Sequence, residues 1–192
     1  MNAVASPASS TTYAEMIGTL RHFLDAISHS DADAVTIEDL TKSMSLWIDR
    51  LGPPQPENDE RVAMRFPLPS RGRAMCPPFV VEKQSSRQVS GTVVFGAHFL
   101  GRNGAAHGGA VAMLFDEVFG HLANEPGQPR ARTAHLEVDY LRITPVDRRL
   151  QVEATIERQE GRKIALVGTL FDDQGPSARA SALMVRLKEG QP

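Results

Sequence analysis

The sequence predicts an α+β fold in which one helix covers a face of an antiparallel sheet. Six segments between residues 79 and 187 alternate apolar and polar residues with period two, as half-buried strands do. A single helical segment, Gly108 to about Asn124, interrupts them after the second strand. Gly161 and the run from Asp172 to Gly175 supply the tight turns that antiparallel hairpins need. One helix on one sheet face is an α+β layer architecture.

The predicted order from residue 79 is strand, strand, helix and four strands. Short connections between the last four strands predict that they pair in sequence order, as a meander. The predicted strands are Phe79–Glu82, Val89–Gly96, Ala134–Ile143, Leu150–Arg158, Ile164–Phe171 and Ala178–Leu187.

Residues 1–52 are expected to form a helical arm ahead of the sheet. Apolar residues recur at helical spacing from Thr12 to Ser28 and again from Ile37 to Leu51. Thr36 with Asp39 resembles a capping arrangement for the second helix, and glycine and two prolines end it after Leu51. Residues 53–78 are rich in Pro, Arg and Gly and predict a connector, so that residues 79–188 form the domain.

Composition excludes several classes of function. The chain has 192 residues, 41% of them hydrophobic and 23% charged, with a formal net charge of -2, so neither disorder nor nucleic-acid binding is expected. No apolar run reaches the length of a membrane span, and the first 12 residues lack the pattern of a signal peptide. Cys76 is the only cysteine, which excludes an intramolecular disulfide and fits a reducing compartment. We expect a soluble, cytoplasmic protein.

The interrupting helix carries two adjacent carboxylates. Six apolar residues, Ala110 to Phe115, precede Asp116 and Glu117. A carboxylate beside such a run either faces water at the edge of the helix or is held there for a purpose, because burying an unpaired charge costs several kcal/mol. Both interpretations stay open on periodicity alone. Glu117 is the rival of Asp116, but it points about 100° away around the helix.

The start of this helix is rich in glycine. Gly104, Gly108 and Gly109 surround the first turn, where backbone amides are unpaired and the helix dipole favours an oxyanion. Asp116 lies eight residues after Gly108, which is about 12 Å along the helix axis at roughly 1.5 Å per residue. One carbonyl group cannot contact both within one chain. If both serve one substrate, the site is shared across a dimer.

Four motifs in order resemble a known family. They are FLGRNGAAHGG at residues 99–109, Asp116 nine positions after His107, TAHLEVDY at residues 133–140 followed by LRITP, and EGRK at residues 160–163. Together they resemble the phenylacetate-pathway (PaaI-like) type of hotdog-fold acyl-CoA thioesterases, closest to the branch with the mitochondrial long-chain enzymes. The resemblance covers roughly residues 79 to 188. It implies a hotdog fold, with an antiparallel sheet wrapped around a central helix.

The resemblance also implies an activity and its catalytic residues. The reaction is hydrolysis of an acyl-CoA to a free acid and coenzyme A, in fatty acid metabolism and without a cofactor. Asp116 acts as nucleophile or as general base for water, and the Gly108 amide polarises the thioester carbonyl. His107 helps to position that carbonyl, and Thr133 assists the carboxylate or its water. The expected assembly is a homodimer or a dimer of dimers.

A path for coenzyme A follows from the same resemblance. It runs along Asp139 and the turn formed by Glu160, Gly161, Arg162 and Lys163, where the two basic residues meet phosphates. Many family members have an asparagine six residues before the histidine. Here that position is Gly101, and Asn103 lies four residues before His107.

Other interpretations of these residues stay open. His107 also suits a simple helix cap, and a charged turn such as 160–163 is commonly just solvated. The five other histidines have no paired spacing suited to a metal, so no metal is expected and surface positions account for them. The competing functions are an acyl-thioester dehydratase or hydratase and an acyl-CoA-binding module without turnover. The helical arm either covers the acyl tunnel or extends the dimer interface, and the sequence does not specify acyl length or aromatic preference.

Overall fold

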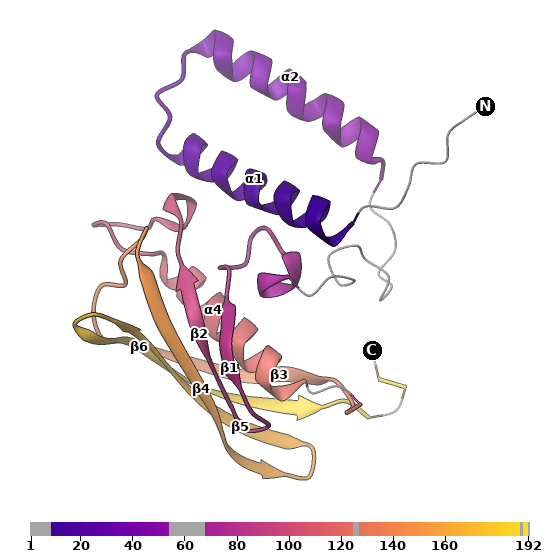
Figure 1. Cartoon of the computed structure of the whole chain (residues 1–192), viewed down its shortest axis with the longest axis vertical. Helices are drawn as coiled ribbons and strands as arrows, with labels where there is room; N and C mark the ends of the chain where they lie inside the picture. Colours follow the sequence, from indigo (N-terminus) through magenta and orange to yellow (C-terminus); the bar gives the residue numbers. More distant parts are fainter. Residues whose placement is uncertain (1–8, 54–67, 125–126, 189, 192) are drawn as a thin grey trace.

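The computed structural model describes residues 9–53, 68–124, 127–188 and 190–191. Within these ranges, one antiparallel sheet of six strands lies against helix α4, and two N-terminal helices lie at one end of the sheet (Figure 1). This is the predicted α+β architecture with its N-terminal helical extension. The predicted division into arm, connector and domain stays a prediction, and residues 54–67 of the connector lie outside the described residues.

The helices and strands have the following bounds. The helices are α1 (Ser10–Ser28), α2 (Ala34–Leu51) and α4 (Gly108–Ala123), with short 3-10 helices η1 (Pro69–Gly72) and η2 (Ala97–Phe99). The strands are β1 (Val80–Gln84), β2 (Gln88–Val94), β3 (Ala131–Tyr140), β4 (Arg149–Glu160), β5 (Lys163–Asp172) and β6 (Gly175–Arg186).

The strand order is β1-β2-β4-β5-β6-β3, so the predicted meander is wrong for β3. β4, β5 and β6 do form consecutive hairpins, but β3 pairs with β6 and leaves its other edge open. β3 also ends at Tyr140 instead of Ile143, because the next two amides both donate to the carbonyl of Ser177. The connection then crosses the end of the sheet, where Asp147 N–H donates to Phe95 O beside β2.

The core lies between α4 and the sheet. The apolar run of α4 is buried there, with Leu114 and Phe115 fully covered, and the sheet contributes residues such as Val152 and Leu170 at 0% exposure. Burial of each such side chain stabilises the fold by about 1.5–3 kcal/mol. α4 is therefore fixed by its packing, which holds the polar residues at its ends and edge in place.

The arm has two capped helices. Ser9 caps α1, and Asp33 caps α2 by accepting a hydrogen bond from Thr36 N–H. The predicted cap by Thr36 with Asp39 is therefore wrong: the chain already turns into the helix at Ala34, and Asp39 lies inside it beside Lys42. None of the described helices is long and apolar enough to cross a membrane.

α2 presents an uncovered apolar face. α1 buries Ile17, but no residue of α2 is buried. Most side chains at helical spacing along one face of α2 are exposed, and Leu40 is half-buried; the exposed ones are Ile37, Met44, Trp47, Ile48 and Leu51. Among the described residues, the arm therefore contacts the rest of the chain mainly through α1.

Candidate active site

The first turn of α4 leaves one amide unpaired. His107 is the N-cap, and its Nδ1 accepts a hydrogen bond from Gly109 N–H at 3.0 Å. The amides of Ala110 and Val111 donate to the His107 carbonyl. The Gly108 amide has no partner among the residues that the structure describes. It is the first-turn donor that remains for a substrate.

His107 therefore caps the helix, which is the simpler of the two interpretations of its sequence position. The same contact determines which nitrogen of the neutral His107 ring carries the proton. Because Nδ1 accepts a hydrogen bond, a neutral ring carries its proton on Nε2. The His107 side chain is exposed, so this N–H is a second donor beside the Gly108 amide.

The loop before α4 explains the glycine at the position of the family asparagine. His107 N–H donates to Phe99 O at 2.7 Å, which brings the two ends of the loop together. A Cβ at Gly101 would lie 3.2 Å from the Cα of His107, so a larger residue would press on the backbone of the cap. Asn103 and Gly104, in the turn of this loop, both adopt a positive φ.

Tyr140 is a site residue for which the sequence suggested no role. Its hydroxyl donates to the carbonyl of Gly108 at 2.8 Å, and a Cβ at Gly108 would lie 3.2 Å from that oxygen. Tyr140 belongs to the strand motif, but only the pairing of β3 along the sheet edge places it against the start of α4.

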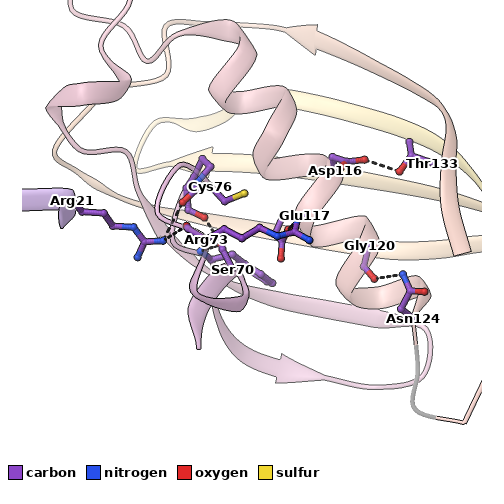
Figure 2. Close-up of polar contacts among 11 residues, drawn as sticks. Arg21, Ser70, Arg73, Cys76, Asp116, Glu117, Gly120, Asn124 and Thr133 are labelled. Atoms are coloured by element: carbon purple, nitrogen blue, oxygen red, sulfur yellow. Dashed lines mark hydrogen bonds and ion pairs between the residues drawn. The ribbon is translucent and has the colours of Figure 1, made fainter. Parts of the chain in front are cut away.

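Asp116 and Thr133 meet at the other end of β3. The Thr133 hydroxyl donates to Asp116 Oδ1 at 2.6 Å, and both side chains are exposed (Figure 2). A β-bulge makes this contact possible, because Thr133 pairs with Met184 while His135 pairs with Leu183. The bulge turns Thr133 to the face of the sheet that carries α4. Asp116 thus lies on the solvent-facing side of α4 and accepts a hydrogen bond from Thr133.

Glu117 has a different environment from Asp116. It is 7% exposed, and Arg73 Nη1 lies 3.4 Å from its Oε2 (Figure 2). This ion pair ties the chain just before β1 to α4 and compensates a buried charge. Cys76 lies nearby, and burial, followed by the charge of Glu117, raises the pKa of its thiol above the ordinary value. A buried thiol with a raised pKa is a poor nucleophile, so neither residue competes with Asp116.

The two halves of the predicted site lie far apart within one chain. Gly108 lies beside Tyr140 at the end of β3, and Asp116 lies beside Thr133 near its beginning. β3 is an edge strand, and the residues described on its open side pair with no other strand of this chain.

The predicted coenzyme A residues do not join either half within this chain. Asp139 lies on β3 between Val138, which packs on the core, and Tyr140, so its side chain points to the opposite sheet face. Glu160 pairs with Lys163 across the β4–β5 turn, where Gly161 has a φ of +57°. Arg162 Nη1 donates to Arg186 O at 2.8 Å. Lys163 lies two strands from β3, about 10 Å away in the sheet.

His98 corrects one prediction about the histidines. It was expected at the surface, but its side chain is 8% exposed and contacts Asp25 of α1. No local sequence pattern indicates this contact, because the two residues lie 73 positions apart. Among the described residues, no group of three or more His, Cys, Asp or Glu side chains is arranged to hold a metal ion.

Part of the domain is similar to a known protein family. Residues 103–178, which include the start of α4, Asp116 and Thr133, match the model of the thioesterase superfamily. This part of the chain is therefore similar to the thioesterase superfamily. The match confirms the resemblance to hotdog thioesterases that the four motifs indicated. The domain's first matched residues are those of the tight turn ahead of α4.

Curated relatives match the thioesterase domain only in part. The acyl-coenzyme A thioesterase THEM4 of Rattus norvegicus is 31% identical over 99 residues, which are 50% of this chain and 42% of THEM4. THEM4 of Mus musculus matches with the same identity and coverage. The chain spans less than half the length of these relatives.

Solved structures share the fold of the domain. The crystal structure of a thioesterase superfamily protein is 26% identical, with a TM-score of 0.74 over 94% of both chains. A hypothetical thioesterase protein with coenzyme A from Streptococcus pneumoniae TIGR4 is 21% identical, with a TM-score of 0.53 over 56% of this chain and 87% of that one. The hotdog fold is thereby confirmed for this domain.

Proposed function

We propose that this protein hydrolyses acyl-CoA thioesters to a free acid and coenzyme A. The observation that carries the proposal is the hydrogen bond from Thr133 to Asp116. It holds an exposed carboxylate on the solvent-facing side of α4. The unpaired amide of Gly108 supplies the complementary group, a donor for the thioester oxygen. The THEM4 relatives are acyl-coenzyme A thioesterases, which supports this substrate class.

We propose that each site is shared by two chains. β3 carries Tyr140 next to Gly108 and Thr133 next to Asp116, and its outer edge is open. Antiparallel pairing of this edge with a second copy, about a two-fold axis near Leu136 and Glu137, brings the Gly108 end of one chain to the Asp116 end of the other. A single chain holds two half-sites, and the dimer holds two complete ones.

The chemistry follows from these positions. The thioester oxygen accepts hydrogen bonds from the Gly108 amide and from His107 Nε2–H of one chain, which stabilise negative charge as it develops there. Asp116 of the other chain either removes a proton from the attacking water or attacks the carbonyl carbon itself. The C–S bond then breaks, coenzyme A leaves as a thiolate that takes up a proton, and the acyl group leaves as a carboxylic acid. If Asp116 attacks the carbonyl carbon itself, loss of the thiolate leaves an anhydride between Asp116 and the acyl group, and water then hydrolyses this anhydride.

Asp116→Asn tests the carboxylate. It preserves the size of the side chain and an acceptor for Thr133, but it removes the charge, so we expect at least a 100-fold loss of kcat with an unchanged fold. The measurement is release of free thiol from acyl-CoAs of several chain lengths, including aromatic ones. Undiminished activity would refute the assignment. An active monomer in sedimentation would refute the shared site.

The same assays separate the competing functions. Tight binding of acyl-CoA without thiol release over hours would identify a binding module, which the unusual Gly101 position favours. Absorbance changes with enoyl or hydroxyacyl thioesters would identify a dehydratase or hydratase. The cytoplasmic location and the role in fatty acid metabolism are part of the proposal, and they rest on the lone cysteine and on the family.

A further inference from the structure

A hydrogen-bonded pair, Asp25 and His98, joins the helical arm to the loop that precedes α4. Asp25 of α1 accepts two hydrogen bonds from His98, one from its backbone N–H at 2.9 Å and one from Nδ1 at 2.5 Å. Gly96 makes room for the carboxylate, because a Cβ there would lie 2.6 Å from Asp25 Oδ1. This contact holds both the backbone and the side chain of one loop residue.

His98 is shielded from water, and Asp25 is partly exposed. The His98 side chain is 8% exposed and that of Asp25 is 28% exposed. Burial raises the pKa of the Asp25 carboxyl, but the hydrogen bonds from His98 outweigh it and hold that pKa below its ordinary value. The contact therefore stabilises the protein above about pH 3.9 and weakens as the pH falls through the lowered pKa. It is intact at neutral pH.

The His98 ring also packs against an aromatic side chain. Its ring lies against that of Phe99 with centroids 4.1 Å apart, and Phe99 packs edge-on against Phe95 at 5.9 Å. His98 Nε2 is buried and has no hydrogen-bond partner among the described residues. The ring therefore depends on Asp25 for its polar contact, and loss of Asp25 leaves a buried imidazole with none.

A short chain of contacts leads from this pair to Gly108. Phe99, the neighbour of His98, accepts a hydrogen bond from His107 N–H at 2.7 Å through its carbonyl. Leu100 and Ala106 form an isolated β-bridge just beside this bond. His107 in turn caps α4 and directly precedes the Gly108 amide. The position of that amide is thus set by the segment that Asp25 holds.

We propose that Asp25 and His98 are positioning residues, through which the helical arm fixes the loop that aims the Gly108 amide at the substrate. This proposal rests on the proposed function for its catalytic consequence. The arm also contacts the residues before β1 elsewhere, because Arg21 donates to the carbonyls of Arg73, Ala74 and Cys76. Loss of the Asp25 contact alone therefore leaves the arm attached while the loop is released.

Asp25→Asn and Asp25→Ala test the proposal in the full-length protein. Asparagine still accepts the hydrogen bond from the His98 backbone, whereas alanine removes both bonds. A displacement of about 1 Å in a catalytic group lowers turnover by up to about 100-fold. We expect kcat to fall by about tenfold or more for Asp25→Ala and by less for Asp25→Asn, with KM within about twofold in both.

Asp33→Ala is the matched control. Asp33 is another arm carboxylate that bonds a backbone amide, but it caps α2, and its hydrogen bonds among the described residues stay within the arm. We expect this variant to keep the wild-type kcat. An equal loss of kcat in Asp33→Ala, or no loss in Asp25→Ala of an active enzyme, would overturn the positioning role.

Amide hydrogen exchange separates this proposal from the proposed function. Both Asp25 variants should speed exchange across residues 96–111, whereas Asp33→Ala should speed it only within the arm. This readout needs no turnover, so it decides the positioning role even if the wild-type protein releases no thiol from acyl-CoA. Unchanged exchange at residues 96–111 in Asp25→Ala would overturn the role whatever the enzyme does.

Discussion

Replacement of Gly108 by proline removes the backbone amide that the proposed mechanism requires, and the structure indicates that the helix tolerates it. Gly108 is the first residue of α4, the position where proline is favoured, because the amide there has no intrahelical partner. His107 precedes it with φ -60° and ψ 130°, the extended conformation that a residue before proline prefers. The variant therefore loses one donor and no hydrogen bond of the fold.

The expected effect on catalysis is large. Removal of one oxyanion donor lowers kcat by about 100- to 1,000-fold, or about 2.7–4 kcal/mol. The neighbouring amides of Gly109, Ala110 and Val111 are all paired within the cap, so none of them replaces it. Thermal unfolding should stay close to that of the control, since the fold loses no contact.

Gly108→Ala is that control. It adds a Cβ at the same place, 3.2 Å from the Tyr140 hydroxyl, but it retains the amide. The assay follows free thiol with a thiol-reactive dye, and the only cysteine, Cys76, is buried with a raised pKa and should react slowly. Equal kcat values for the proline and alanine variants would refute the role of the amide.

Mixing of inactive chains tests whether sites are shared. Subunit exchange between Gly108→Pro and Asp116→Asn should restore about a quarter of the wild-type activity, because half of the dimers are mixed and each has one intact site. No recovery in verified mixed dimers would contradict the shared site.

Two further outcomes are expected. Thr133→Val removes the hydrogen-bond donor to Asp116 while preserving the shape of the side chain, and it should lower kcat about tenfold. Thr133→Ser should retain most activity in the same thiol assay. Equal kcat values for the two variants would mean that the hydroxyl is not used. If the arm extends the dimer interface, Ile48→Glu should weaken association in sedimentation, whereas Leu46→Glu should not. The two side chains are similarly exposed, at 66% and 62%, but they lie about 200° apart around α2, so only Ile48 belongs to the apolar face. The same association state for both variants would reject that role.

The order of the elements followed from the sequence, and its motifs marked candidate site residues. Period-two segments, one helix between them and two amphipathic N-terminal stripes are local patterns, and they predicted the α+β class and the position of α4. Gly108, Asp116 and Thr133 were marked by motif spacing. The offset of eight residues between Gly108 and Asp116 already predicted that they serve different sites within one chain, because helix rise is fixed.

Tertiary structure decided what depends on pairing between distant segments. The place of β3 beside β6 follows from where residues 141–148 cross the sheet, which no local pattern records. The bulge at Thr133 turns its hydroxyl to Asp116, and a one-residue difference in register reverses which face a side chain takes. Asp25 and His98 lie 73 positions apart, and only the docking of α1 brings them together. Local sequence thus determined which groups are present, and packing determined which of them meet.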